Sequence, residues 1–579
     1  MNEVSPSGEK TPRTGRFLLA LALSVLASFA LAGAYLAPNH YPPWTSFHGE
    51  AAAFAALIFF SAARLAWPSA LVAARATWLA LAAVGVIAIQ WRVGQIAYAG
   101  DAFVCAMYVC GWALAWWLGA NSHDLAARSE PFVWFAWIVV LSAAAAVVVA
   151  HLQWLRMESI VGVFAAERGP EMRAYSNLGQ PNHLASLMMM ATALAVLLHA
   201  SRRIGTLTCV VLVAWFAWGL TLSESRSGLL SAFCMGALVV AKGRGHPALP
   251  RAKWVALWFA ALAALAVAWP SINDAMYLQA PRGALAAHDS ARQVIWKQCI
   301  AGIERSPWVG YGVRQGMVGQ KAGAESVDGW QASDYAHNAV LDLLLWFGVP
   351  LGLLLSGAAI GWFARMLLRT RGADEVLLFG SILPVLVHSM FEYPFAYSYF
   401  LFPATWVVAL LARMQRERIS HTPLPQAQGS ARLRVAIAVV LFGVAAAAAA
   451  REYILAEEDY RVMRFEMRHV GRTPDGYEAP QLVLLTQLRE MLELGRIAPR
   501  EHMPPGEIDR LREGSLRFGW ANLQLIYAMS LALNGDPQQA GREMRLLRAS
   551  YGDDAYSSAR AVWKDMQARH PELGTVRLP

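Results

Sequence analysis

The sequence predicts an all-α protein whose helices cross a membrane many times, and three observations support this fold class. Apolar residues make up 57% of the 579-residue chain and charged residues only 15%, where soluble domains average roughly 25% charged. The apolar residues recur in blocks of about 17–22, enough to cross a ~30 Å hydrocarbon core as helices. Lys and Arg concentrate in short loops between the blocks. We therefore attribute the net charge of +9 to membrane topology and not to nucleic acid binding.

Thirteen apolar blocks follow a polar and basic N-terminal tail, residues 1–16. The run from Phe17 to Ala37 is longer than the apolar core of a signal peptide, so we expect it to be the first span and the tail to be cytoplasmic. The pattern predicts about 12–13 spans, about nine in residues 17–270 and the rest in residues 337–451. The other blocks fall near residues 51–67, 76–92, 102–120, 131–153, 183–200, 205–222, 227–241, 254–270, 337–363, 375–391, 397–413 and 433–450.

Basic clusters test this count independently of hydropathy. When the chain is traced from a cytoplasmic start, every cluster falls in a cytoplasmic loop, as the positive-inside rule expects: Arg202/Arg203, Lys242/Arg244/Arg251/Lys253, Arg365/Arg369/Arg371, and Arg413/Arg416/Arg418 with Arg432/Arg434. The same alternation assigns the long polar segments to the non-cytoplasmic side of the membrane. They include residues 154–182, a large loop (residues 271–336) and a C-terminal domain (residues 452–579).

The C-terminal domain is charged and has helical periodicity. Its stretch "ANLQLIYAMSLALNGDPQQAGREMRLLRASYG" predicts two amphipathic helices around a Gly-Asp-Pro turn, similar to one tetratricopeptide unit. A single unit cannot bury its own apolar face. We therefore expect this pair to pack on neighbouring helices or to bind a partner.

The five cysteines have no spacing typical of a metal or redox site. Four of them lie in apolar blocks, where cysteine acts as a small apolar residue; the five are Cys105, Cys110, Cys209, Cys234 and Cys299. We expect no disulfide framework, no metal site and no cofactor.

Two groups of polar residues lie at predicted non-cytoplasmic ends of spans in the first half of the chain. The stretch "NLGQPNH" places Gln180 and Asn182 at the mouth of a span, where helix capping is the simpler explanation. The stretch "SESRSG" places Arg226 at a non-cytoplasmic membrane edge, against the orientation rule. Such an arginine must be paired or functional. Glu224 is the candidate partner.

A third group lies in the large loop, in "SARQVIWKQCIAGIERSPWVGYG". Arg292, Trp296 and Ile300 are spaced four apart, which places them on one helix face. An amphipathic helix at the membrane interface, anchored by Trp296 and Trp308, is the alternative. That alternative explains the aromatic residues but not Arg292.

The fourth group opens the apolar run "SDYAHNAVLDLLLWFGVPLG", with Asp334, His337 and Asn338 in five residues. A second stretch on the same predicted side, "HSMFEYPFAYSYF", adds Glu392 and Tyr393. A single histidine at a helix start is more often a cap than a catalyst. Convergence of four polar groups on one membrane edge favours a functional site over helix capping.

The residue types in these groups suit one kind of chemistry. The planar fork of arginine donates two charge-assisted hydrogen bonds to a pyrophosphate and stays charged at any relevant pH. Histidine, with an unperturbed pKa near ~6.5, suits a general base. Together they describe a site for a diphosphate-linked lipid donor and an acceptor hydroxyl that must lose a proton.

These motifs resemble those of the bacterial O-antigen ligase and polymerase superfamily: "SRSG" after one span, "SPWVGYG" in a large loop and "HN" before the next span. Within it, "NLGQPNHLA", "HSMFEYPFAYSYFLFP", "HYPPWTSFHGE" and the helical tail are most similar to protein O-oligosaccharyltransferases of the pilin-glycosylation ligase type. The likeness spans roughly residues 35–415. It implies en bloc transfer of a glycan from undecaprenyl diphosphate, with neither nucleotide sugar nor metal.

The resemblance also implies roles for particular residues. His337 would activate the acceptor hydroxyl, and Arg226 and Arg292 would hold the diphosphate as leaving group. Gln180 and Tyr393 match positions implicated in the oligosaccharyltransferase branch. On chemistry alone we add Asp334 and Glu392 as orienting partners of His337 or of the arginines, with Asn182 and Asn338 as further substrate-binding candidates. Direct attack by the hydroxyl predicts inversion at the sugar.

The resemblance leaves the acceptor open. Ser or Thr of a periplasmic, pilin-like protein is favoured by the Gln-Pro-Asn and Glu-Tyr-Pro motifs, while a sugar of lipid A-core and glycan polymerisation are alternatives. A transporter of the same lipid-linked glycan should carry ionisable residues deep in its spans and repeat symmetry. Here the polar residues gather at one membrane edge instead. A membrane scaffold for the helical tail would not explain Arg226, Arg292 and His337.

Overall fold

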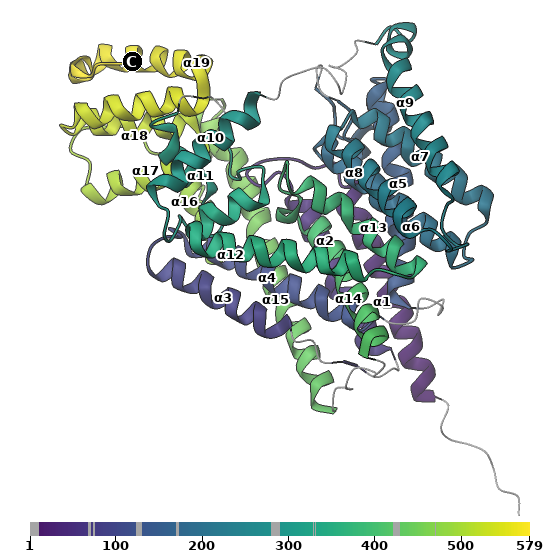
Figure 1. Ribbon diagram of the computed structural model, residues 1–579. Coiled ribbons are helices and arrows are strands. Elements are labelled where there is room, and N and C mark those ends of the chain that lie inside the picture. Colours follow the sequence, from purple (N-terminus) through teal and green to yellow (C-terminus); the bar gives the residue numbers. More distant parts are fainter. Residues whose placement is uncertain are drawn as a thin grey trace, which may run out of the picture.

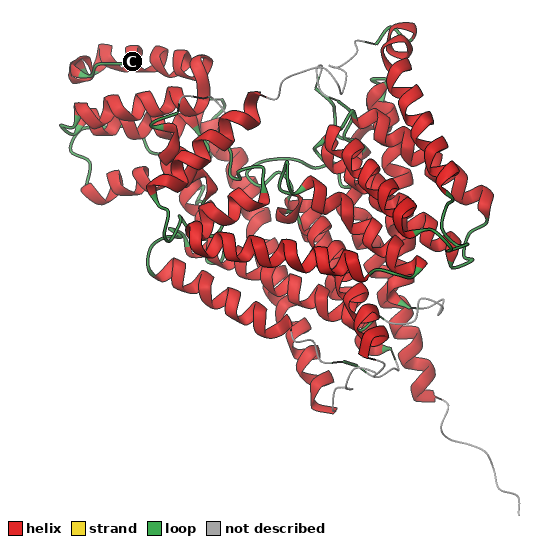
Figure 2. Ribbon diagram, in the orientation of Figure 1, coloured by secondary structure: helices red, strands yellow, loops and turns green. Residues whose placement is uncertain are grey.

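A computed structural model describes residues 11–67, 71–72, 76–122, 130–169, 173–278, 290–327, 329, 332–420, 429–468 and 470–579. Most of the predicted cytoplasmic tail, residues 1–16, and part of the large loop lie outside the described residues. Every regular element in the described ranges is a helix (Figure 2). The all-α prediction is therefore confirmed.

A helix covers each of the thirteen predicted apolar blocks. These helices are α1 (Thr11–Leu36), α2 (Phe47–Ala66), α3 (Ala76–Arg92), α4 (Ala99–Ala120), α5 (Pro131–Trp154), α6 (Pro181–Ala200), α7 (Thr206–Ser223), α8 (Arg226–Lys242), α9 (Ala252–Ala275), α12 (Ala339–Arg369), α13 (Ala373–His388), α14 (Ser398–Ser420) and α15 (Gly429–Met467). The remaining α-helices in the described ranges are α10 (Ser290–Arg305), α11 (Gly316–Ala324) and α16–α19 near the C-terminus, and three short 3₁₀ helices are η1 (Glu158–Phe164), η2 (Pro394–Ala396) and η3 (Pro571–Thr575).

Nine helices in the described ranges are long and apolar enough to span a membrane, fewer than the 12–13 blocks counted from the sequence. The difference has a simple reason. Helices α3 and α8 have 17 residues each and α13 has 16, whereas α14 has 23 but ends in a basic last turn. The chain is a multi-pass membrane protein.

The bundle is built around α6, which is buried along most of its length. It packs against α5, α7 and α13, and α13 also contacts α8 and α14. Figure 1 shows α5–α9 as one group at the upper right, beside the more central α2, α4 and α14. The polar residues at the start of α6 are consequently surrounded by the ends of α7, α8 and α13.

Helix α12 is interrupted at Gly348, which has φ 76° and ψ 174°, a conformation essentially restricted to glycine. The loop that follows α10 satisfies the backbone groups freed by this break. Tyr311 N–H donates to the Leu345 carbonyl at 2.7 Å, and Val349 N–H donates to the Pro307 carbonyl at 2.6 Å. The predicted 337–363 block is thus a short helix, a break and then a long apolar helix.

The large loop, residues 271–336, is itself largely helical where it is described. In α10 the buried apolar side chains are Ile295, Cys299 and Ile303, which pack against the start of α12. Ile300 is 47% exposed. Ile295, Cys299 and Ile303 are spaced four apart, so α10 packs through the stripe next to the one that carries Arg292, Trp296 and Ile300.

The C-terminal helices continue from the membrane bundle without a linker, because α15 runs unbroken for 39 residues across residue 451. Four helices follow: α16 (Thr486–Leu494), α17 (Pro505–Arg517), α18 (Ala521–Leu533) and α19 (Pro537–Arg569). Helices α18 and α19 form the predicted pair, and Asp536 in the turn caps α19 by accepting from Gln539 N–H at 3.0 Å. The pair packs on α17 and α11, as expected of an apolar face that cannot be buried alone. Its likeness to a tetratricopeptide unit stays a prediction.

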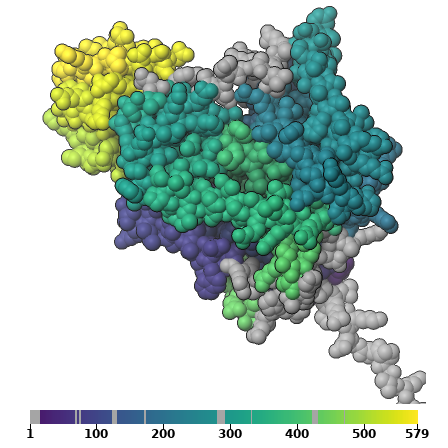
Figure 3. All heavy atoms as spheres, in the orientation of Figure 1, coloured from purple at the N-terminus to yellow at the C-terminus, as the bar shows by residue number. Residues whose placement is uncertain are grey.

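The space-filling view shows the C-terminal helices and α9 projecting on either side of a lower central face (Figure 3). The opposite ends of the helices carry the basic clusters. There Lys242, which ends α8, donates to the Leu368 carbonyl near the end of α12 at 3.4 Å. At the same end of the bundle Arg418 pairs with Glu375 at 2.9 Å. Each of α6, α8, α12 and α13 therefore has one end at the polar groups and the other near a basic cluster.

Candidate functional site

The segment that carries His337 is held by hydrogen bonds on both sides. His337 has φ 55°, an uncommon left-handed conformation for a residue other than glycine. Before it, Ala336 N–H donates to Asp342 Oδ1 at 2.8 Å. After it, Asn338 caps α12 and donates from Nδ2 to the Met390 carbonyl at 3.1 Å. Asn338 thus has a structural role, and substrate binding by Asn338 stays a prediction.

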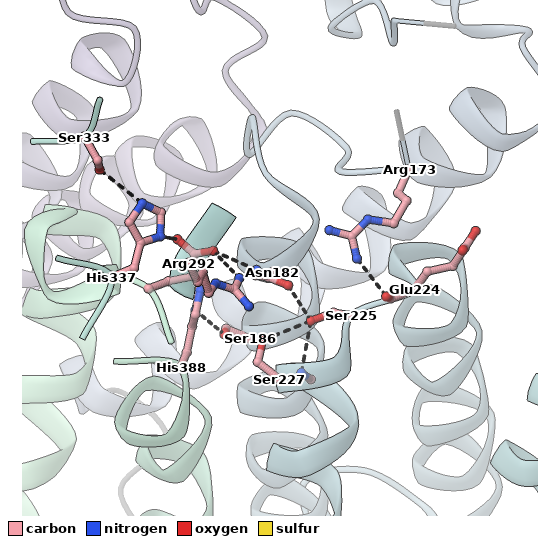
Figure 4. Close-up of polar contacts among 12 residues, drawn as sticks. Arg173, Asn182, Ser186, Glu224, Ser225, Ser227, Arg292, Ser333, His337 and His388 are labelled. Carbon is pink, nitrogen blue, oxygen red and sulfur yellow. Dashed lines mark hydrogen bonds and ion pairs between the residues drawn. The ribbon is translucent and has the colours of Figure 1, made fainter. Parts of the chain in front are cut away.

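Glu392 is the centre of the site, although it is only 4% exposed. Its Oε2 forms an ion pair with His337 Nδ1 at 2.5 Å. Its Oε1 accepts from Arg292 Nη2 at 2.5 Å and from Asn182 Nδ2 at 3.3 Å. The start of α12, the start of α10 and the start of α6 therefore meet at one carboxylate (Figure 4).

The electrostatics of this contact favour an ionised carboxylate. Burial alone would raise the pKa of Glu392. The hydrogen bond and charge of His337, with the charge of Arg292, outweigh burial and lower that pKa to about 2. The carboxylate is therefore charged at physiological pH and can orient both the His337 ring and the Arg292 guanidinium group.

The other ring nitrogen of His337 faces a hydroxyl. His337 Nε2 lies 3.1 Å from Ser333 Oγ. The ring of Tyr393 stands edge-on to the imidazole, with centroids 4.9 Å apart, and stacks on Tyr335 at 4.4 Å. Burial, followed by the charge of Glu392, raises the pKa of Tyr393 to about 12. Tyr335 in turn lines an apolar cavity of about 430 Å³ between α3, α4 and the start of α12.

A chain of polar contacts leads from Asn182 to the start of α8. Asn182 Oδ1 accepts from Ser225 Oγ at 2.7 Å. Ser225 is the N-cap of α8 and accepts from Gly228 N–H at 3.0 Å. Arg226 is therefore the first residue of the helix, and its side chain is exposed. An exposed arginine at a helix N-terminus, where backbone N–H groups also point outward, suits an anionic ligand.

A third arginine, missed in the sequence analysis, lies in this region. Arg173 Nη1 donates to the backbone carbonyl of Glu224 at 2.7 Å. Burial lowers the pKa of Arg173, and the charges of Arg292 and Arg226 lower it further, which places all three guanidinium groups within electrostatic range. Arg173 falls in the segment 154–182 that the alternation assigned to the non-cytoplasmic side. The positive-inside rule, which marked Arg226 as an unusual arginine on the non-cytoplasmic side, marks Arg173 in the same way.

Glu224 itself has partners other than those expected. Its Oε1 accepts from Trp269 Nε1 at 3.1 Å, and its backbone holds Arg173. Burial raises the pKa of Glu224 to about 7, against the hydrogen bond of Trp269 and the charge of Arg173. This carboxyl group is thus mainly part of the α7–α9 contact.

Two more predicted residues flank the site. Gln180 is half-buried at the N-cap of α6, two residues before Asn182. The Asp334 carboxylate contacts the C-terminal helices, since its Oδ1 lies 3.4 Å from Arg517 Nη1. A residue outside the predicted set, Ser186, lies 2.9 Å from Nδ1 of the buried His388 (Figure 4).

Comparison with protein families gives three matches along the chain. The model described as protein glycosylation ligase matches residues 174–199, and the model described as O-antigen ligase matches residues 211–356. A third, described as the C-terminal part of a virulence factor membrane-bound polymerase, matches residues 376–565. Together they include every residue of the site described above except Arg173.

Two curated relatives come from Acinetobacter baylyi. A general O-oligosaccharyltransferase is 26% identical over 558 residues, which cover 93% of each chain. A ComP-specific O-oligosaccharyltransferase is 24% identical over 398 residues, which cover 66% of this chain and 70% of the relative. No solved structure matches the chain.

Proposed function

We propose a reaction for this chain from its homology. The chain is a homologue of the O-oligosaccharyltransferases and O-antigen ligases, and it is therefore an enzyme of the glycosyltransferase type. It transfers a preassembled glycan en bloc from undecaprenyl diphosphate to an acceptor hydroxyl. The observation that carries the proposal is the contact of Glu392 with both His337 and Arg292. One carboxylate thereby joins a base suited to the hydroxyl and a cation suited to the leaving group.

His337 acts as the general base through Nε2. Its Nδ1 faces the ionised Glu392, so the proton of a neutral imidazole stays on Nδ1 and leaves a lone pair on Nε2. Ser333 Oγ, 3.1 Å from Nε2, marks a position from which an acceptor hydroxyl can give up its proton. Glu392 then stabilises the imidazolium that forms.

The proposed step is a single displacement. The acceptor oxygen bonds to the anomeric carbon, the bond from that carbon to the diphosphate oxygen breaks, and the hydroxyl proton passes to His337. Undecaprenyl diphosphate leaves with the negative charge, which Arg226 and Arg292 stabilise as it develops. One displacement inverts the configuration. Because the arginines supply the positive charge, we expect no requirement for a metal ion or a cofactor.

Gln180 and Tyr393 complete the proposed binding surface. Gln180 is half-buried beside Asn182, and Tyr393 packs its ring edge-on against His337. The position of Gln180 suits contact with donor sugars, and the Tyr393 ring fixes the plane of the His337 imidazole.

For the acceptor we propose Ser or Thr of a periplasmic protein. This choice is supported by similarity to a general O-oligosaccharyltransferase over 93% of both chains. The second candidate is O-antigen ligation to lipid A-core, which the O-antigen ligase match over residues 211–356 favours. We place the enzyme in the bacterial inner membrane with the site and the C-terminal helices facing the periplasm, because the basic helix ends lie at the other end of the bundle.

The test uses purified enzyme with a lipid-linked glycan and either a protein or a lipid A-core acceptor. His337→Ala should lower the rate by roughly 10²–10⁴-fold, the usual contribution of a general base. The matched control is His246→Ala, in the loop after α8 at the other end of the bundle, which should keep the wild-type rate. Unchanged transfer by His337→Ala would refute the role of His337 as base.

A strain that lacks the gene for this protein identifies the acceptor. Loss of a glycan mass increment on a periplasmic protein supports the oligosaccharyltransferase. Loss of O-antigen laddering on lipopolysaccharide, with protein glycosylation intact, supports the ligase instead.

A further inference from the structure

The guanidinium group of Arg517 joins three parts of the chain that are far apart in sequence. Arg517 ends α17 and is 8% exposed, and its partner Asp101 in the first turn of α4 is 1% exposed. Nε donates to Asp101 Oδ2 at 2.7 Å and Nη2 donates to Oδ1 at 2.8 Å. This two-point contact matches the fork of arginine to the plane of the carboxylate. Arg517 is therefore fixed relative to α4.

The remaining Arg517 nitrogen faces the segment that carries His337. Nη1 lies 3.4 Å from Asp334 Oδ1, three residues before His337. The Asp334 side chain is 54% exposed, so few protein contacts restrict it. On the backbone side α11 approaches closely, since a Cβ on Gly316 would lie 2.3 Å from the Asp334 carbonyl oxygen. Asp334 thus lies between α11 and Arg517.

Other contacts keep the C-terminal helices docked without Asp334. Lys321 of α11 donates to the Ser515 carbonyl. The rings of Tyr98 and Phe518 stack with centroids 5.6 Å apart. Loss of the Asp334 carboxylate therefore leaves the docking contacts in place and acts on the segment before His337.

We propose that Arg517 is a positioning residue for the site: it holds Asp334 and thereby the backbone that presents His337 to Glu392. The C-terminal helices then take part in catalysis indirectly, by fixing the base. This inference rests on the proposed function for its kinetic consequence, but its structural consequence can be measured without any substrate. A displacement of the base by about 1 Å is enough to cost much of the rate.

The kinetic test compares Asp334→Asn, Arg517→Lys and the double variant in the full-length enzyme in lipid nanodiscs. Asp334→Asn keeps the size of the side chain and should lower kcat roughly tenfold with little change in the KM for the donor. In the double variant the loss of kcat should not exceed the loss in Arg517→Lys alone, because both substitutions break the same contact between Arg517 and Asp334. Losses that multiply would overturn the proposal.

The matched control is Asp475→Asn. Asp475 also forms an ion pair with an arginine of the C-terminal region, Arg472, at 2.8 Å, but both side chains are more than 80% exposed. This variant should keep the wild-type kcat. An equal loss in Asp475→Asn and Asp334→Asn would overturn the positioning role of Arg517.

A second readout is hydrogen exchange of the backbone amides of residues 333–341. Exchange should be faster in Asp334→Asn than in wild type, while α4 and α17 exchange at unchanged rates. Unchanged exchange in this segment would overturn the proposal even if activity falls. If wild type transfers no glycan at all, the proposed function fails, and the exchange result still decides whether Arg517 positions the segment.

Discussion

Glu392 shows how one residue organises the site, since its carboxylate contacts His337, Arg292 and Asn182. Removing one partner of a buried charged contact leaves the others uncompensated. We therefore expect His337, Arg292 and Asn182 to act as a unit with Glu392, so that the effects of substituting them on the transfer rate do not add.

The pKa of Glu392 leads to a prediction about stability and pH. Its folded-state pKa of about 2 lies below its ordinary value of 4.5. The carboxylate thus contributes stability that is fully present above pH 4.5 and is lost as the pH falls towards 2, on the order of a few kcal/mol. Thermal unfolding in detergent should show Glu392→Gln less stable than wild type at pH 6, with a smaller gap at pH 3. A gap that is constant with pH would contradict this assignment.

Arg173 gives a prediction for the donor. Arg173→Ala should raise the KM for the lipid diphosphate roughly tenfold, because one of three neighbouring cations is lost, and Arg173→Lys should restore it only in part. The measurement is initial transfer rate against donor concentration. Arg472→Ala, an exposed arginine of the C-terminal region, is the control and should not change the KM. An unchanged donor KM in Arg173→Ala would remove Arg173 from the site.

At the scale of elements, the break in α12 determines where His337 lies. The short helix before Gly348 packs against α10, and the backbone bonds from Tyr311 and Val349 fix the angle between the two parts. A straight helix over the whole apolar run would lose these bonds and carry its first turns away from α10.

Gly348→Ala tests this arrangement. The new Cβ would lie 2.5 Å from the carbonyl carbon of Trp308, and the positive φ disfavours any side chain. We expect a loss of about 1–3 kcal/mol in unfolding free energy and a fall in the transfer rate. The control is Gly357→Ala in the same helix, where nothing lies within 4 Å of the new Cβ. Its stability should stay within about 1 kcal/mol of wild type, and equal losses in both variants would contradict a role for the break.

For the whole molecule, the position of the basic helix ends predicts orientation. Alkaline phosphatase fused after residue 200, at the end of α6, should be inactive, and the same reporter fused after residue 579 should be active. Fusions of green fluorescent protein at these two points should give the reverse pattern. Activity at both points, or the opposite pattern, would contradict a periplasmic site.

The sequence alone determined the properties that depend on local pattern. Apolar blocks predicted a helix at each of thirteen places, and alternation with basic loops predicted that His337, Arg226, Arg292 and Glu392 share one end of the bundle. These inferences succeed because helix length, hydropathy and loop charge are read from neighbouring residues.

Only the tertiary structure decided which of these residues touch. It brought Glu392 between His337 and Arg292, added Arg173, turned Asp334 towards Arg517 and showed which stripe of α10 packs against α12. These polar contacts join residues 51 to 183 positions apart, and they depend on how helices pack and where one of them breaks at a glycine. The hydrophobic pattern says which residues are apolar, but it does not say which helix will cover them.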